Sequence, residues 1–377
     1  MIYLICFIIS CILISLGNKK KRKIIVYIGL ILPCVLAGLR NYTIGTDVQV
    51  YVKPLVEIAQ NKDNFVEFFN SRWWYVWCFK YVSQFEIGYI MFVYVIVKIF
   101  NSLQMVLFFT QTIISIFMYK AIIKYKDIEG KEWLAMLVYY LLFYNIGLNA
   151  MRQFISISIL FYGFSLLIND HNRIKFIVLF ILAFLFHKSS ILGLIIWGGY
   201  ELFENKYIKN NKIVLNGKSV NGKKIILMLI ILLFSFFVIN NSLFIKFLNL
   251  LGMDNYSGYI TGNIKVGMIS VVKILPFIIL LLFNWSEVKR KKNVYLYLYI
   301  FLCFFIFSQY ASVSSFGARV AFLFETFNLI LYPTICCTEN NKSINYVLLI
   351  SYLLFYWWFY FIHGGANQTY PYIFYFN

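Results

Sequence analysis

The sequence predicts an all-α, polytopic bundle of transmembrane helices. Of its 377 residues, 62% are hydrophobic and only 13% are charged, whereas a soluble domain carries roughly 25% charged residues. The apolar runs are continuous rather than alternating, which indicates membrane helices and not the strands of a barrel. Lysine and arginine cluster in short polar breaks between these runs, as is typical of cytoplasmic loops.

The composition also excludes several other classes. The net charge of +19 does not indicate nucleic-acid binding, because no motif for it accompanies the basic loops. The longest polar stretches are about 25 to 45 residues. We therefore predict one integral membrane domain over 1–377. The seven cysteines fit neither a zinc site nor a disulfide framework.

Basic loops set the orientation of about 12 predicted spans. Ile2–Leu16 lacks a basic leader and a cleavage site, so it is predicted to be a retained span rather than a signal peptide. The cluster Lys19–Lys23 follows and places that loop in the cytoplasm. Ile24–Leu39 then crosses to the exterior.

The stretch 40–85 is predicted to be an external loop. Trp73, Trp74 and Trp77 are typical of the headgroup level, so 64–82 is expected to form one or two interfacial helices. The next apolar run, 86–100, is short for a span and suits a re-entrant segment. The alternative is that 65–82 crosses instead, which its charged residues disfavour.

The remaining spans alternate between inside and outside loops. The segment 204–224, rich in lysine and asparagine, is predicted to be cytoplasmic, and 240–270 is predicted to be a second external loop. The predicted spans are Leu103–Tyr119, Leu134–Leu148, Phe154–Ile168, Phe176–Phe186, Ile191–Phe203, Ile225–Ile239, Val271–Trp285, Val294–Tyr310, Val320–Cys336 and Tyr346–Ile362.

Charged residues stand in the external breaks. The break Asn149–Gln153 carries Arg152 between two apolar runs, and a charge near hydrocarbon indicates a functional site. The lysine loops place this break outside, together with five other titratable residues. We expect one external site formed by Arg40, Asp47, Glu86, Arg152, His187 and Arg319.

Arginine suits phosphate because its planar fork makes bidentate contacts and keeps its charge. Three arginines on one face would bind a lipid pyrophosphate and stabilise it as it leaves. The alternative is that each arginine reaches the interface with its charged tip or pairs with a carboxylate.

A sugar hydroxyl that attacks an anomeric carbon needs a general base. His187 is the first candidate, since histidine titrates near neutral pH, although a helix-terminal histidine is about as often structural. Asp47 and Glu86 are rival bases, and either could instead hold an arginine. No metal or nucleotide motif is present, so we expect neither metal nor cofactor.

The chain resembles the EpsG-like branch of the Wzy-type bacterial polysaccharide polymerases. The resemblance is carried, in order along the chain, by Gly38-Leu39-Arg40, Ile44-Gly45-Thr46-Asp47, Glu86-Ile87-Gly88-Tyr89, Met151-Arg152-Gln153, Phe186-His187-Lys188-Ser189-Ser190, Arg319 and Tyr370-Pro371-Tyr372. It implies a glycosyltransferase-C-like helical fold and metal-independent glycosyl transfer. It also implies that Gln153, Tyr370 and Tyr372 belong to the substrate site. The stretch Phe154–Ser158 departs from the usual alanine-rich pattern.

The resemblance implies a polymerase of undecaprenyl-pyrophosphate-linked repeat units of an exopolysaccharide, capsule or O-antigen. It would lie in the bacterial cytoplasmic membrane, with its active site facing the exterior. Candidate partners, besides membrane lipid, are a chain-length regulator and a flippase of the same pathway. A ligase of the same class is the nearest alternative. A lipid-linked oligosaccharide transporter is disfavoured, because no internal repeat is evident and the charges lie at span ends.

Overall fold

The computed structural model describes residues 1–204, 212–215, 218–221, 246, 268–291, 293–312, 317–338 and 342–376. These residues fall into two compact units. The first unit comprises Met1–Ser190 and Ile350–Asn377, and the second comprises Ile191–Leu349. The single membrane domain expected over 1–377 stays a prediction.

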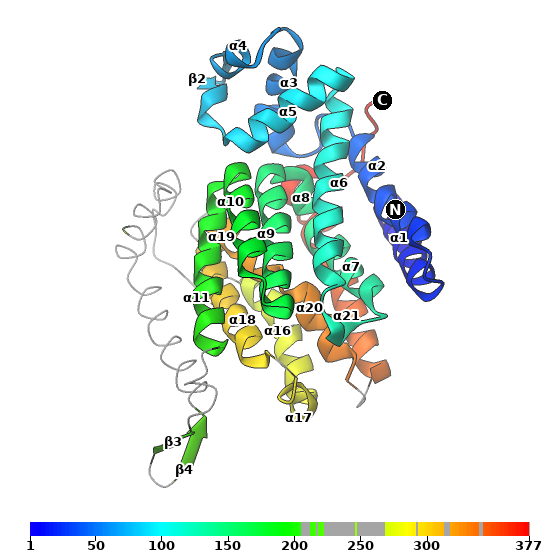
Figure 1. Ribbon diagram of the computed structural model, residues 1–377. Coiled ribbons are helices and arrows are strands. Elements are labelled where there is room, and N and C mark those ends of the chain that lie inside the picture. Colours follow the sequence, from blue (N-terminus) through cyan, green and yellow to red (C-terminus); the bar gives the residue numbers. More distant parts are fainter. Residues whose placement is uncertain are drawn as a thin grey trace. The chain divides into compact units, whose positions relative to one another are not determined.

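The first unit is a bundle of apolar helices around α9 (Figure 1). Almost every side chain of α9 is buried, and α9 packs against both α6 and α10. The helices of the bundle are α1 (Ile2–Lys19), α2 (Lys23–Gly38), α6 (Leu103–Ile122), α7 (Glu132–Tyr139), α8 (Asn145–Asn149), α9 (Met151–Asp170) and α10 (Arg173–Phe186). A π-helical segment, Tyr140–Tyr144, joins α7 to α8.

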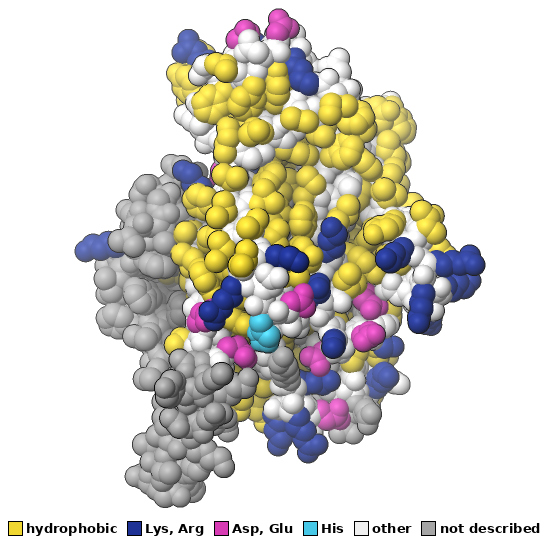
Figure 2. Space-filling view, viewed as in Figure 1, with side chains coloured by type: hydrophobic (Ala, Val, Ile, Leu, Met, Phe, Trp, Pro, Cys, Tyr) yellow, Lys and Arg dark blue, Asp and Glu magenta, His cyan; other side chains and the backbone are white. Residues whose placement is uncertain are grey.

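Helix length and composition mark the chain as a membrane protein. Among the described residues, four helices are long and apolar enough to cross a membrane: Ile2–Lys19, Leu103–Ile122, Met151–Asp170 and Lys342–His363. On the face shown in Figure 2, hydrophobic side chains cover the middle of α6, α9 and α10, and charged ones gather toward the ends. The predicted span Ile225–Ile239 and most of the loop 240–270 lie outside the described residues. The count of 12 spans and the glycosyltransferase-C-like fold therefore stay predictions.

The two ends of the first unit differ in chemistry. Helix α9 runs from Met151, which precedes Arg152, to Asp170, where Lys124 pairs with the Asp170 carboxylate at 2.6 Å. Helix α10 returns to His187, beside the start of α9. The lysine-rich loops therefore share one end of the unit, and the predicted site residues before position 190 share the other end. The inside–outside orientation of these ends stays a prediction.

A small cap covers the site end. It contains α3 (Lys53–Gln60), α4 (Phe65–Phe69), α5 (Ile87–Phe100) and a hairpin of β1 (Arg72–Tyr75) and β2 (Cys78–Tyr81) (Figure 1).

The expectation of helices throughout 64–82 is wrong, because 72–81 forms this antiparallel hairpin. Its aromatic residues favour strands, and the directly opposed Trp74 and Phe79 pack edge to face at 4.8 Å between ring centroids. Val76 makes the turn with a φ of 54°.

Helix α5 stays within the cap. Its Tyr94 hydroxyl donates to the Asp63 carbonyl at 3.0 Å, and Gln60 donates to the Asn101 carbonyl just beyond its end. Its 14 residues extend about 21 Å, short of the roughly 30 Å hydrocarbon core. The expectation that 86–100 does not cross as a simple span stays a prediction.

The second unit contains α11 (Gly193–Glu204), α16 (Met268–Phe283), α17 (Trp285–Val288), α18 (Val294–Ser308), α19 (Gly317–Glu325), α20 (Asn328–Cys336) and the first half of α21 (Lys342–Trp357). The loop 204–224 carries a hairpin of β3 (Lys212–Leu215) and β4 (Lys218–Asn221), so the chain is not wholly helical. Within the predicted span Val320–Cys336 the helix breaks after Glu325, and the span itself stays a prediction. The Thr326 hydroxyl donates to the Phe322 carbonyl, a contact that bends helices.

Gly88 permits a close approach between the cap and the bundle. A Cβ at this position would lie 2.7 Å from the Leu185 carbonyl oxygen of α10. We expect Gly88→Ala to destabilise the protein by about 1–3 kcal/mol through overpacking. Thermal unfolding in detergent would measure the loss. Gly198→Ala is the matched control, since a Cβ there meets nothing within 4 Å. Equal unfolding temperatures for the two variants would contradict the prediction.

Candidate functional site

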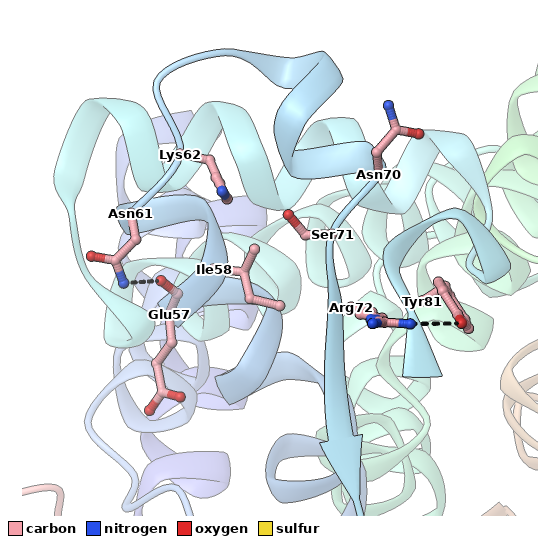
Figure 3. A pocket seen from close by; sticks show the side chains of 8 residues that line it. All are labelled: Glu57, Ile58, Asn61, Lys62, Asn70, Ser71, Arg72 and Tyr81. Carbon is pink, nitrogen blue, oxygen red and sulfur yellow. Dashed lines mark hydrogen bonds between the residues drawn. The ribbon is translucent and has the colours of Figure 1, made fainter. Parts of the chain in front are cut away.

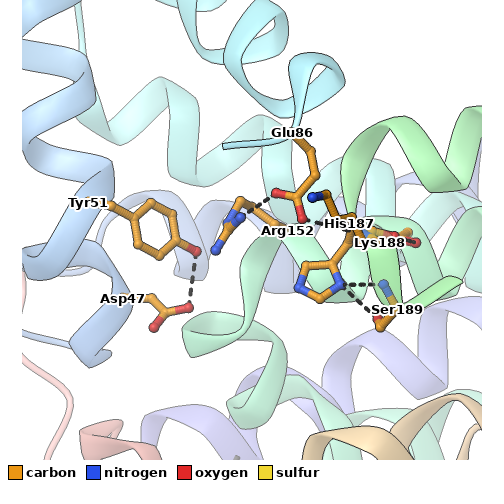
Figure 4. Close-up of polar contacts among 8 residues, drawn as sticks. Asp47, Tyr51, Glu86, Arg152, His187, Lys188 and Ser189 are labelled. Carbon is orange, nitrogen blue, oxygen red and sulfur yellow. Dashed lines mark hydrogen bonds and ion pairs between the residues drawn. The ribbon is translucent and has the colours of Figure 1, made fainter. Parts of the chain in front are cut away.

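Arg152 is the centre of a polar cluster at the site end of the first unit (Figure 4). It lies in the first turn of α9, and the single non-helical residue Ala150 separates this helix from α8. Its guanidinium pairs with the Glu86 carboxylate. The same group lies over two aromatic rings, with 4.7 Å to the centroid of Tyr51 and 4.8 Å to that of Phe85. The carboxylate and the two aromatic rings together hold the cation in position.

Glu86 holds Arg152 in place. One carboxylate oxygen faces Arg152, and the other accepts the Lys188 backbone N–H at 3.3 Å. Burial raises the pKa of the Glu86 carboxyl, but the charge of Arg152, together with His187 and backbone N–H groups, outweighs burial and keeps this pKa below its ordinary value. A carboxylate with a lowered pKa and both oxygens engaged is a weak base.

His187 uses its Nδ1 as an acceptor. The Ser189 backbone N–H donates to this nitrogen at 3.2 Å, and the Ser189 hydroxyl lies 2.7 Å from it. Gln153 in turn donates to that hydroxyl at 3.4 Å. These contacts assign the proton of a neutral His187 to Nε2. Neutral His187 therefore presents a donor rather than a base, which weighs against its role as the first candidate.

Asp47 lies on the opposite side of Arg152 from His187 (Figure 4). It is half-buried, and its carboxylate accepts the Tyr51 hydroxyl at 3.0 Å. The same tyrosine contacts the Arg152 guanidinium with its ring. Asp47, Tyr51 and Arg152 are thus one connected group, and Asp47 is the remaining carboxylate suited to accept a proton.

Asn149 anchors the segment that carries Asp47. Its side-chain oxygen accepts the Thr46 hydroxyl at 3.0 Å and the Asp47 backbone N–H at 2.9 Å. Its amide nitrogen donates to Asn367 of the C-terminal segment at 3.2 Å. Gly45 allows this approach, because it has a φ of 88° and lies against the Leu148 carbonyl.

Arg40 is a buried cation, with 1% of its surface exposed. It donates to the Leu148 carbonyl at 2.9 Å, and its Nε has no hydrogen-bond partner. Among the described residues, no carboxylate forms a salt bridge with it. Burial lowers the pKa of its guanidinium, yet arginine keeps its proton in proteins. A buried cation without a counter-charge suits an anionic ligand.

The C-terminal segment lies beside Arg40. The backbone of Arg40 forms an isolated antiparallel β-bridge with that of Phe374, and the Tyr372 hydroxyl donates to the Leu36 carbonyl at 2.7 Å. Tyr372 therefore holds the segment in place, whereas the Tyr370 side chain is exposed.

Arg319 lies in α19 of the second unit, so its expected membership of the site stays a prediction. The second unit has a buried ion pair of its own, Lys273 with Glu325 at 2.8 Å. Within the described ranges, no group of three or more His, Cys, Asp or Glu residues could hold a metal ion.

Sequence reasoning missed Tyr51, Phe85 and Ser189, and treated Asn149 only as part of a break. Aromatic and serine side chains carry no charge in an apolar sequence, so nothing distinguishes them from packing residues. Phe85 directly precedes Glu86 and Ser189 follows His187 by two residues, and this proximity in the sequence is the one signal available.

We expect Asn149→Ala to reduce both stability and activity, because it leaves the buried N–H of Asp47 without its acceptor. Loss of such a partner costs about 1–3 kcal/mol. Thermal unfolding and polymer yield would measure the two effects. Asn169→Ala is the control, since the Asn169 side chain donates locally to the Ser165 carbonyl at 3.0 Å. Normal polymer yield from Asn149→Ala would rule out this anchoring role.

These features define a helical membrane protein that gathers buried arginines, carboxylates and a histidine at one end of a bundle. The chain matches the model of the EpsG family over residues 23–374, and it belongs to that family. Membership indicates a glycosyltransferase-like polymerase of exopolysaccharide biosynthesis. No curated protein and no solved structure matches the chain.

Proposed function

We propose that this protein polymerises undecaprenyl-pyrophosphate-linked repeat units at the external face of the cytoplasmic membrane, without a metal ion. The observation that carries the proposal is the Arg152 guanidinium, which is oriented by Glu86, Tyr51 and Phe85 and is joined to candidates for proton transfer. Such a preorganised cation is suited to an anionic leaving group.

The proposed reaction is one displacement. A hydroxyl at the non-reducing end of one lipid-linked unit attacks the anomeric carbon of the growing chain. The new bond joins that oxygen to the anomeric carbon, and the bond from the anomeric carbon to the pyrophosphate oxygen breaks. The hydroxyl proton passes to a base, and the lipid pyrophosphate leaves as an anion.

The contacts of each residue support a division of roles. Asp47 is the base, because Glu86 is neutralised by Arg152 and the Nδ1 of His187 is engaged as an acceptor. Arg152 and Arg40 stabilise the pyrophosphate, and Arg319 is the third proposed member of this group. The Nε2–H of neutral His187 is a further donor to the departing oxygens.

Purified protein in detergent, supplied with lipid-linked repeat units alone, would test this function. We expect a ladder of longer glycans on gels. Products confined to transfer of a preformed chain onto a different acceptor would indicate a ligase instead. If detergent-solubilised protein joins no units while the same protein moves them across vesicles, the protein is a transporter.

A further inference from the structure

The cap contains a polar cleft that the reaction above does not use (Figure 3). Its volume is about 550 Å³, which lies within the roughly 300–1,000 Å³ of small-molecule sites. The cleft is open to solvent and lies between α3, the turn after it and the β1–β2 hairpin. Six of its lining side chains carry the argument: Glu57, Asn61, Asn70, Ser71, Arg72 and Tyr81.

The lining combines hydrogen-bond donors with acceptors. Asn61 and Asn70 offer both kinds of group, and Arg72 offers several donors in one plane. Arg72 is itself oriented, because its guanidinium lies 4.3 Å from the Phe79 ring centroid and donates to the Tyr81 hydroxyl at 3.4 Å. Sugar hydroxyls donate and accept at once, so this mixture matches a glycan better than an apolar chain.

The cleft carries charges of both signs, which suits a polar ligand better than a purely anionic one. Glu57 stands in the wall of the cleft, 3.8 Å from Lys53, and Lys62 and Arg72 add two cations to the lining. A pyrophosphate would face the Glu57 carboxylate, whereas the buried Arg40 forms no salt bridge with a carboxylate of the described residues. Asn61 and Asn70 are both exposed. Asn61 already donates to the Glu57 carbonyl at 2.8 Å, which leaves its side-chain oxygen and the Asn70 amide group for a ligand that enters from solvent.

Strand β1 connects the cleft to the reaction site. Successive side chains of a strand point to opposite faces. Arg72 is exposed and lines the cleft, and the next residue, Trp73, is half-buried. Trp73 stacks on Phe85 with 5.8 Å between ring centroids, and Phe85 contacts Arg152. The cleft and the polar cluster around Arg152 therefore lie on opposite faces of one short strand.

We propose that this cleft binds sugar residues of the glycan chain that is being extended. The inference rests on the proposed function, since it names where the polymer is held during its transfer. The cleft residues contact no reacting group in this arrangement, so they are positioning residues. They hold the chain near Arg152 between successive additions and thereby set its length.

Chain length separates this role from the chemistry. In the full-length protein, we expect Asn70→Ala combined with Arg72→Ala to keep the rate of the first addition within about twofold, while the mean chain length falls several-fold. Lys98→Ala is the control, because Lys98 is an exposed cation of the same cap outside the cleft. A ladder of wild-type length from the double variant would overturn the proposal.

Direct binding gives a second readout that does not depend on catalysis. The probe is the free glycan, cleaved from its lipid, from cells that carry this protein, titrated into purified protein by calorimetry. We expect Arg152→Ala to bind it as the wild type does, and the cleft double variant to bind at least tenfold more weakly. Absent binding by the wild type, or equal binding by the double variant, would refute the cleft. A failure of the proposed function would give a different result, because Arg152→Ala would then extend lipid-linked units at the normal rate.

Discussion

Arg152→Ala is expected to lower polymer synthesis by about 10²–10³-fold, the usual cost of removing one preorganised group that stabilises transition-state charge. The substitution removes the cation held between Tyr51, Phe85 and Glu86. The measurement is the initial rate of extension of lipid-linked units by purified protein. Lipid-linked single units should accumulate in cells that carry the variant.

The conservative variant tests the role of the guanidinium itself. Lysine keeps the charge but lacks the planar fork that stacks on rings and binds phosphate bidentately, so we expect Arg152→Lys to stay impaired. Arg173→Ala is the matched control, because Arg173 is an exposed arginine at the opposite end of the unit. If Arg152→Lys extended chains at the wild-type rate, charge alone would suffice. That result would disprove a requirement for the planar guanidinium.

Stability must be separated from chemistry in this experiment. Arg152→Ala leaves the carboxylate of Glu86 largely buried without its partner, and breaking such a pair costs about 3–5 kcal/mol. Adding Glu86→Gln removes the unpaired charge and should recover part of the lost stability. We expect the double variant to fold better than Arg152→Ala and to remain inactive. Recovered activity would mean that the ion pair is structural only.

The second large effect is expected for Asp47→Asn, which removes the proposed base while keeping its shape. General base catalysis contributes about 10²–10⁴-fold, so the extension rate should fall by that factor with little change in stability. The Asp47 backbone N–H, and its bond to Asn149, are unaffected by the substitution. Extension rate and thermal unfolding, measured on the same preparation, would separate the two effects.

The matching variant at His187 decides between the candidate bases. His187→Gln removes the Nε2–H donor and the Nδ1 acceptor, and we expect a loss of about tenfold, corresponding to one hydrogen bond of roughly 1.4 kcal/mol. A larger loss for His187→Gln than for Asp47→Asn would reverse the assignment and make His187 the base. Glu86→Gln should reduce activity through the position of Arg152.

Apolar composition and basic loops determined the class of this protein from sequence alone. Continuous hydrophobic runs can satisfy their backbone in a membrane only as helices. The expectation that Arg40, Asp47, Glu86, Arg152 and His187 share one end of the bundle follows from the same pattern, and the first unit brings these five residues together. A charged side chain near hydrocarbon costs free energy, so each of these residues could be identified from the sequence as a candidate for the site.

Only the tertiary structure decided which role each candidate can take. The neutralised Glu86 depends on Arg152 and Lys188, which are 66 and 102 positions away, and no local pattern encodes such pairings. The engaged Nδ1 of His187 depends on Ser189, two residues further along the chain, but the backbone conformation that makes this contact cannot be read from the sequence. The cap hairpin over 72–81 depends likewise on cross-strand packing of Trp74 with Phe79. Hydrophobicity and charge are properties of single residues, whereas proton positions and strand pairing depend on which partners the fold brings within hydrogen-bonding distance.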